Sequence, residues 1–104
     1  MNIETTKEGT GSNVPRGANV KVHYTGRFED GQKFDSSQGG PPLKFQVGLG
    51  QVIRCWDEGM LKMNKGQEAL LTCPPEYAYG KKGAGGVIPP NATLKFEVKI
   101  IDYN

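Results

Sequence analysis

Only one stretch of the chain has apolar residues at helical spacing, and this restricts the folds that the chain can adopt. In residues 51–63, Ile53, Trp56, Met60 and Met63 recur at i, i+3, i+7 and i+10. This spacing places them on one face of a helix of about three turns, and that face must be buried. A single helix cannot bury a tryptophan and two methionines by itself. The rest of the chain must therefore wrap around it, and we expect Trp56 at the centre of the molecule.

The other ordered segments alternate apolar and polar residues, which is the period of a half-buried strand. The predicted strands are 19–28, 43–47, 68–73 and 92–100, with residues 3–6 as an edge strand. Asp30-Gly31, between Phe28 and Phe34, predicts a hairpin with a type I′ turn, in which both central residues have positive φ. No second helix separates the strands, so we expect an antiparallel sheet with one face wet and the other packed on the helix. The predicted fold class is α+β.

Length and charge exclude several classes of protein. The chain has 104 residues, which predicts one domain over residues 1–104. The formal charge of +2 comes from 13 basic and 11 acidic residues without a basic run, which argues against binding to nucleic acid or to a membrane surface. The N-terminus is polar, and no apolar run approaches the roughly 20 residues that span a bilayer. We expect a soluble protein of the cytoplasm.

The sequence offers no ligand set for a metal and no cofactor motif. Cys55 and Cys73 are the only cysteines, and they lack CxxC spacing or a histidine cluster. We expect both to be free, buried thiols. The only histidine, His23, falls on the wet face of its strand, where it is expected to be a solvated surface residue.

The candidate site is aromatic. The chain shows no nucleophile with a base, no carboxylate pair and no metal cluster. Residues 74–90 form a loop longer than the roughly 12–15 residues usual in compact domains, and the apolar pair Val87-Ile88 within it needs a pocket to line or cover. We expect an apolar cup above Trp56, with Asp35 at its rim. The aromatic residues expected to form it are Tyr24, Phe34, Phe45, Trp56, Tyr79 and Phe96.

Four segments together resemble the FKBP family of peptidyl-prolyl cis-trans isomerases, the receptors for the macrolides tacrolimus and rapamycin. They read HYTGRFEDGQKFDSS, GQVIRCWDEGMLKMNKGQ, PPEYAYG and GVIPPNATLKFEV, and the resemblance runs from about Thr5 to the C-terminus. It implies the minimal single-domain form of the family, a twisted antiparallel sheet curled around one short helix. The implied activity is cis-trans isomerisation of X-Pro bonds.

The resemblance also implies the site. Trp56 would be the floor under a proline ring, and the Ile53 N–H and the Tyr79 hydroxyl would bond ligand carbonyls. Asp35 would meet a polar group of the drug and orient the tyrosine pair. The implied catalytic residues are Asp35, Trp56, Tyr79 and Phe96. The implied substrate-binding residues are Tyr24, Phe34, Asp35, Phe45, Val52, Ile53, Trp56, Tyr79, Ile88 and Phe96.

The chain departs from the family pattern at Leu43, Gln51, Cys55 and Ala84, which bear on the rim more than on the floor. The implied partners are proline-containing peptides and proteins, the two macrolides and, through them, calcineurin or TOR kinase, with the chain as a monomer. Twisting an amide needs no proton transfer, so the missing catalytic dyad fits an isomerase. It equally fits a non-catalytic module that grips proline-containing partners or regulates a larger complex, and the sequence leaves both open.

Overall fold

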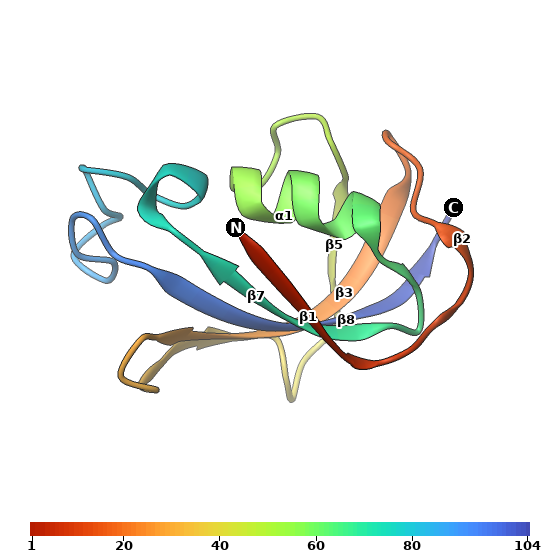
Figure 1. The fold of residues 1–104 in the computed structure, drawn as a ribbon, viewed down its shortest axis with the longest axis horizontal. Helices are drawn as coiled ribbons and strands as arrows, with labels where there is room; N and C mark the ends of the chain where they lie inside the picture. Colours follow the sequence, from red (N-terminus) through yellow and green to blue (C-terminus); the bar gives the residue numbers. More distant parts are fainter.

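The computed structural model describes residues 1–104 as an antiparallel sheet that curves beneath one short helix (Figure 1). The strand order is β1-β7-β8-β3-β4, and β5 also pairs with β3. The predicted α+β class is confirmed. The bounds of these strands are β1 (Asn2–Lys7), β3 (Asn19–Phe28), β4 (Lys33–Ser36), β5 (Leu43–Gln46), β7 (Glu68–Cys73) and β8 (Leu94–Tyr103).

A second, two-stranded sheet pairs β2 (Thr10–Asn13) with β6 (Asn64–Lys65). The sequence pattern predicts no strand between residues 6 and 19, so β2 was missed. All four residues of β2 are exposed. Without a buried face the strand carries no alternating apolar pattern, and its presence depends on pairing with a segment far along the chain.

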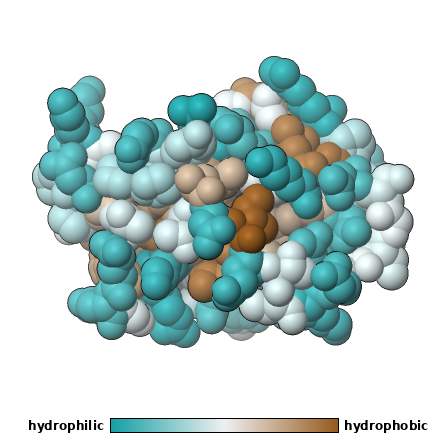
Figure 2. All heavy atoms as spheres, in the orientation of Figure 1, coloured by the Kyte–Doolittle hydropathy of each residue, from teal (hydrophilic) through white to brown (hydrophobic).

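Alternation in the long strands sets the two faces of the main sheet. In β7 every second residue is buried, from Ala69 to Cys73, and the same holds in β8 from Leu94 to Ile100. β1 pairs only with β7, which confirms the predicted edge strand. The inward side chains and the helix form one hydrophobic core. Polar side chains cover most of the outer surface seen in Figure 2, and apolar atoms appear there only in separate patches.

The hairpin between β3 and β4 forms, but with a different turn from the one predicted. Gly31 N–H donates to the carbonyl of Phe28, and Phe28 N–H donates to the carbonyl of Gln32. Gly31 has a φ of 92°, whereas Asp30 does not have positive φ. This is the three-residue loop in which a type I turn is followed by a left-handed glycine. Position 31 is therefore the only one in this turn whose backbone conformation favours glycine.

The helix is shorter than the periodicity predicted. α1 spans Arg54–Gly59, and the chain then tightens into the 3₁₀ turn η1 (Met60–Lys62). Residue 53 has extended backbone, so the helix cannot begin earlier. The methionines remain fully buried because the 3₁₀ turn keeps them on the core side. No helix of the structure is both long enough and apolar enough to cross a membrane.

Asp57 ties the helix to the loop before it. Its carboxylate accepts N–H bonds from Gly48 at 2.9 Å and Gly50 at 2.7 Å. Farther along the helix, a methyl group added at Gly59 would lie 3.4 Å from the Leu71 side chain of β7. β7 therefore approaches the helix closely at Gly59.

The expectation of free thiols is wrong, because Cys55 and Cys73 form a disulfide. It joins the first turn of α1 to the end of β7, with a Cα–Cα distance of 5.8 Å. Both residues face the core from elements that pack on each other, which brings them together although 18 positions separate them in sequence. A pair with this spacing carries no local signal, so only the tertiary packing shows it.

We expect loss of this crosslink to lower the free energy of unfolding by about 2–4 kcal/mol, because the bond restricts the unfolded chain across a loop of moderate length. The measurement is urea denaturation of the wild type, with and without reductant, beside the variant Cys55→Ala/Cys73→Ala. The variant should be insensitive to reductant. Two free thiols titrated in unfolded wild-type protein prepared without reductant would contradict the disulfide.

Candidate active site

A cavity of about 210 Å³ opens beside the start of α1, and it is largely apolar. Small-molecule sites usually measure roughly 300–1,000 Å³, so this cavity takes one ring or side chain and leaves the rest of a ligand outside. β3, β4, β5, β8, α1 and the loop after β7 contribute to its wall. The lining residues are Tyr24, Phe34, Asp35, Leu43, Gln51, Val52, Ile53, Trp56, Tyr79 and Phe96.

Trp56 lies at the centre of the aromatic contacts. Its ring is 4.9 Å from that of Tyr24 and 5.2 Å from that of Phe96, and both pairs are edge-to-face. Phe34 in turn meets Phe96 edge-to-face at 5.7 Å. Such pairs stabilise beyond the area that they bury and fix the angle between neighbouring rings. The cavity wall is therefore a rigid set of aromatic surfaces.

The indole nitrogen of Trp56 is buried and donates to no atom of the chain. An unpaired buried donor is uncommon in folded proteins and costs about 1–3 kcal/mol. Trp56 is only 5 % exposed, so water does not compensate freely. This unpaired donor belongs to Trp56, the side chain at the centre of the aromatic cluster.

One carboxylate lies on the cavity wall, and it is already engaged. Asp35 accepts a hydrogen bond from the Tyr24 hydroxyl at 2.8 Å and another from the Ser36 N–H. Burial, followed by the hydrogen bond and the charge of Asp35, raises the pKa of Tyr24 to about 12. Tyr24 therefore stays protonated and keeps donating to Asp35 throughout the physiological pH range. The carboxylate of Asp35 is therefore bonded to the Tyr24 hydroxyl and does not face the cavity without a partner.

Two donors remain open to a ligand at the mouth of the cavity. The Ile53 N–H precedes the first turn of α1 and makes no backbone hydrogen bond, as expected for the first amides of a helix. Tyr79 is 40 % exposed, and its hydroxyl contacts no protein acceptor within hydrogen-bond distance. A carbonyl entering beside Trp56 could accept from either group.

Most residues expected at the site from the sequence are brought together on this wall. Phe45 and Ile88 are not. The Phe45 ring lies 5.9 Å from that of Trp56, and Ile88 is buried in the loop after β7, where its backbone bonds to Ala84. Val87, which was expected to line or cover a pocket together with Ile88, is 57 % exposed.

Leu43 and Gln51 line the cavity but were considered only as departures from the family pattern. Gly26 of β3 was missed as well. A methyl group there would lie 2.6 Å from Phe34 Cζ and 2.9 Å from Phe96 Cε1. A glycine inside a strand pattern is a signal of close approach, so the sequence did contain this information. Gly26 makes room for the two rings that form one side of the wall.

His23 lies outside the cavity. It is half-buried on the outer face of the sheet, where its Nδ1 is 2.9 Å from the Ser37 hydroxyl. His23 was expected to be a solvated surface residue, but in the structure it is half-buried and contacts Ser37. The structure has no group of three or more His, Cys, Asp or Glu side chains arranged to hold a metal ion.

A family model described as FKBP-type peptidyl-prolyl cis-trans isomerase matches residues 11–101. The chain belongs to this family. As an FKBP-type chain it is 52 % identical to FK506-binding protein 1 of Dictyostelium discoideum, covering 99 % of both chains. It is 54 % identical to the peptidyl-prolyl cis-trans isomerase Fkbp12 of Drosophila melanogaster, over 89 % of this chain and 88 % of the other.

The FKBP fold is also found by comparison with solved structures. The structure titled "Crystal structure of AtFKBP13" superposes with a TM-score of 0.93 at 38 % identity, covering 98 % of this chain and 91 % of that one. The agreement confirms the predicted sheet curled around one short helix.

We expect Gly26→Ala to lower the free energy of unfolding by about 1–3 kcal/mol, because the new methyl group forces the rings of Phe34 and Phe96 apart. Chemical denaturation measures the loss. Gly40→Ala is the matched control, since Gly40 is exposed and a methyl group there would meet only the Ser37 carbonyl oxygen, at an ordinary contact distance of 3.8 Å. Its stability should change by less than about 0.5 kcal/mol. Equal stability of the two variants would contradict this packing of the wall.

Proposed function

We propose that the apolar cavity is the active site of a peptidyl-prolyl cis-trans isomerase, with the proline ring of the substrate resting on Trp56. The observation that carries this proposal is the aromatic wall around Trp56, with open donors at its mouth and its one carboxylate already bonded. Membership of the FKBP family supports it. The catalytic residues would be Asp35, Trp56, Tyr79 and Phe96.

Isomerisation needs a change of shape and no change of covalent bonds. Resonance holds the peptide bond planar with a barrier of about 18–20 kcal/mol, and an X-Pro bond exchanges uncatalysed in tens to hundreds of seconds. Rotation breaks the resonance and lowers the charge on the carbonyl oxygen. An apolar wall disfavours the polar planar amide more than the twisted one. Binding the twisted form more tightly than the planar form is sufficient for catalysis.

Each named group has a separate part in this mechanism. Trp56 and Phe96 hold the ring and exclude water around the rotating bond. The Ile53 N–H and the Tyr79 hydroxyl donate to carbonyls of the substrate and so position the bond. Asp35 fixes Tyr24 through the 2.8 Å bond, which keeps that ring against Trp56. Tyr24, Phe34 and Val52 complete the wall, and the proposed substrate-binding set also includes Phe45, whose ring lies 5.9 Å from that of Trp56, and the buried Ile88.

A millionfold acceleration corresponds to about 8 kcal/mol of stabilisation of the twisted state. Isomerisation is already unimolecular, so holding the substrate contributes by restricting it to the geometry that rotates. Each hydrogen bond made best in that geometry adds about 0.5–1.5 kcal/mol. No proton-transferring residue is required.

We also propose that tacrolimus and rapamycin bind at this cavity, each inserting one ring and leaving most of the macrolide outside. The names of several relatives, such as FK506-binding protein 1, support drug binding in the family. Complexes with calcineurin or TOR kinase through the bound drug, and a monomeric state, are further parts of this proposal that follow from the resemblance. Leu43 and Gln51 lie on the wall where such a drug would leave the cavity.

The cytoplasmic location remains a proposal, and the disulfide bears directly on it. Disulfides persist in oxidising compartments, whereas the cytosol keeps thiols reduced. In the cytoplasm the Cys55–Cys73 pair would therefore be present mainly as thiols. Alkylation of lysed cells before any oxidation, followed by mass spectrometry of the two cysteine peptides, distinguishes the compartments.

We expect the protein to accelerate cis-trans exchange of a Leu-Pro tetrapeptide, and tacrolimus to abolish the acceleration by filling the cavity. A protease-coupled assay measures exchange, and calorimetry measures drug binding. The control is the same assay with buffer alone. Drug binding or peptide binding without any acceleration would leave the non-catalytic binding module as the function.

A further inference from the structure

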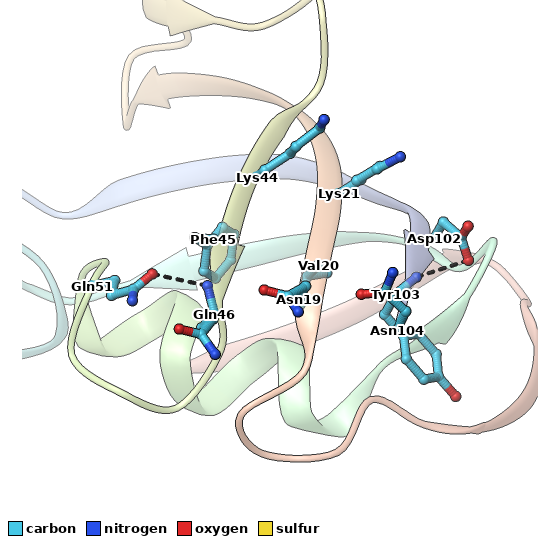
Figure 3. A pocket seen from close by; sticks show the side chains of 10 residues that line it. All are labelled: Asn19, Val20, Lys21, Lys44, Phe45, Gln46, Gln51, Asp102, Tyr103 and Asn104. Atoms are coloured by element: carbon cyan, nitrogen blue, oxygen red, sulfur yellow. Dashed lines mark hydrogen bonds between the residues drawn. The ribbon is translucent and has the colours of Figure 1, made fainter.

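A second cavity, larger than the apolar one, is a polar groove next to the active site. It has a volume of about 580 Å³ and runs from Gln51 across β5 and β3 to the end of β8 (Figure 3). Gln51 also lines the apolar cavity, so the two hollows share this residue. The groove contains no nucleophile or histidine. Its lining residues are Asn19, Val20, Lys21, Lys44, Phe45, Gln46, Gln51, Asp102, Tyr103 and Asn104.

Gln51 also determines how the strand edge beside the groove is used. β5 pairs with β3 on one side only, so its other edge is open. The outward N–H of Gln46 on that edge donates to the Gln51 side-chain oxygen at 2.9 Å. Because this N–H is already bonded, it is not available to pair with a polypeptide that would add to the edge as a further strand. It can instead turn from the cavity around β5 into the groove.

Two lysines lie side by side in this groove, and neither forms an ion pair, although Lys21 is also the cross-strand partner of Asp102. Lys21 and Lys44 are direct cross-strand partners, and their side chains point the same way in Figure 3. Like charges placed opposite each other on a sheet destabilise it. The four ion pairs of the structure use other cations, namely Lys7, Arg27, Arg54 and Lys65. The lysine pair is therefore free to bind an anion.

Asp102, the one acidic side chain in the groove, already forms an ion pair with Lys65. Its carboxylate accepts the N–H of Tyr103 at 2.9 Å and lies 3.3 Å from Lys65 Nζ. These contacts hold the pKa of Asp102 below its usual range and keep it charged. Lys21 adds a weaker attraction but forms no ion pair with it. The remaining charge of the groove is positive and comes from Lys21 and Lys44.

We propose that this groove is a second subsite, which binds acidic side chains of the same polypeptide whose proline occupies the cavity. The proposal rests on the isomerase function proposed above. The shared residue Gln51 places the groove beside the cavity, within reach of a substrate that leaves it, and the adjacent lysines supply the charge complementarity. Substrates with Asp or Glu a few residues from proline are then favoured over neutral ones.

The test uses twelve-residue peptides with a central Leu-Pro bond. In each pair, one peptide carries three glutamates on one side of this bond and the other carries three glutamines there. One pair places these residues before the bond and a second pair places them after it. Exchange NMR gives kcat/KM. For one flank we expect the acidic peptide to be preferred about fivefold at low salt, as two exposed ion pairs allow. The preference should fall at high salt because the charges are screened.

Lys21→Gln/Lys44→Gln should remove the preference and leave turnover of a Leu-Pro tetrapeptide unchanged, since the tetrapeptide does not reach the groove. Lys95→Gln/Lys99→Gln is the control, with the same change in charge on the same face of the sheet but outside the groove. It should keep the preference. No preference on either flank, or equal loss in both variants, would overturn the proposal. Absent catalysis of the tetrapeptide would instead contradict the isomerase function.

Discussion

The packing of Trp56 between α1 and the sheet is the contact on which the rest of the site depends. A helix of six residues contributes little stability of its own, and it is held by what its buried face touches. Trp56 meets Phe96 of β8 and Tyr24 of β3, and the neighbouring Cys55 is bonded to the end of β7. The same contacts that fix the helix also fix the floor of the cavity.

This arrangement explains why a cavity can persist in so small a core. A void normally collapses or costs stability, because its lining atoms lose their contacts. Here the lining rings are held edge-to-face by one another, and the Asp35–Tyr24 bond and the Asp57 contacts with the loop before α1 hold the rim. These contacts are all made within the chain, so little ordering is needed when a proline ring enters.

The sequence predicted the features that follow from local period. Alternation placed β3, β7 and β8 with the correct face inward, and the helical spacing around Trp56 identified the core helix. The length of that helix was overestimated because a 3₁₀ turn keeps Met60 buried just as an α-helical turn would. The turn type at Asp30-Gly31 was wrong because the same dipeptide also suits a three-residue loop.

Features that depend on distant segments could not be predicted in this way. The Cys55–Cys73 bond joins elements that meet only in the folded chain. Phe45 was expected on the cavity wall because it lies on an inward strand position, yet in the structure it lines the polar groove, with its ring 5.9 Å from that of Trp56. That Gln51 lines both the cavity and the polar groove likewise depends on the positions of β5 and the loop after it. The local sequence pattern shows which residues share one face of a strand or helix. It does not show which of these faces come together to enclose a cavity.

The central claim is that the cavity acts by its shape and low polarity, without moving a proton. The most direct test is kcat/KM for a Leu-Pro tetrapeptide between about pH 6 and 8, in H₂O and D₂O, for the wild type and His23→Ala. Tyr24 keeps its proton because its pKa is raised to about 12, and His23 lies on the other face of the sheet. We expect less than about twofold variation with pH, no large solvent isotope effect and wild-type activity for His23→Ala, whereas a histidine base would titrate near pH 6.5. A bell-shaped profile, a large isotope effect or an inactive His23→Ala would contradict the claim.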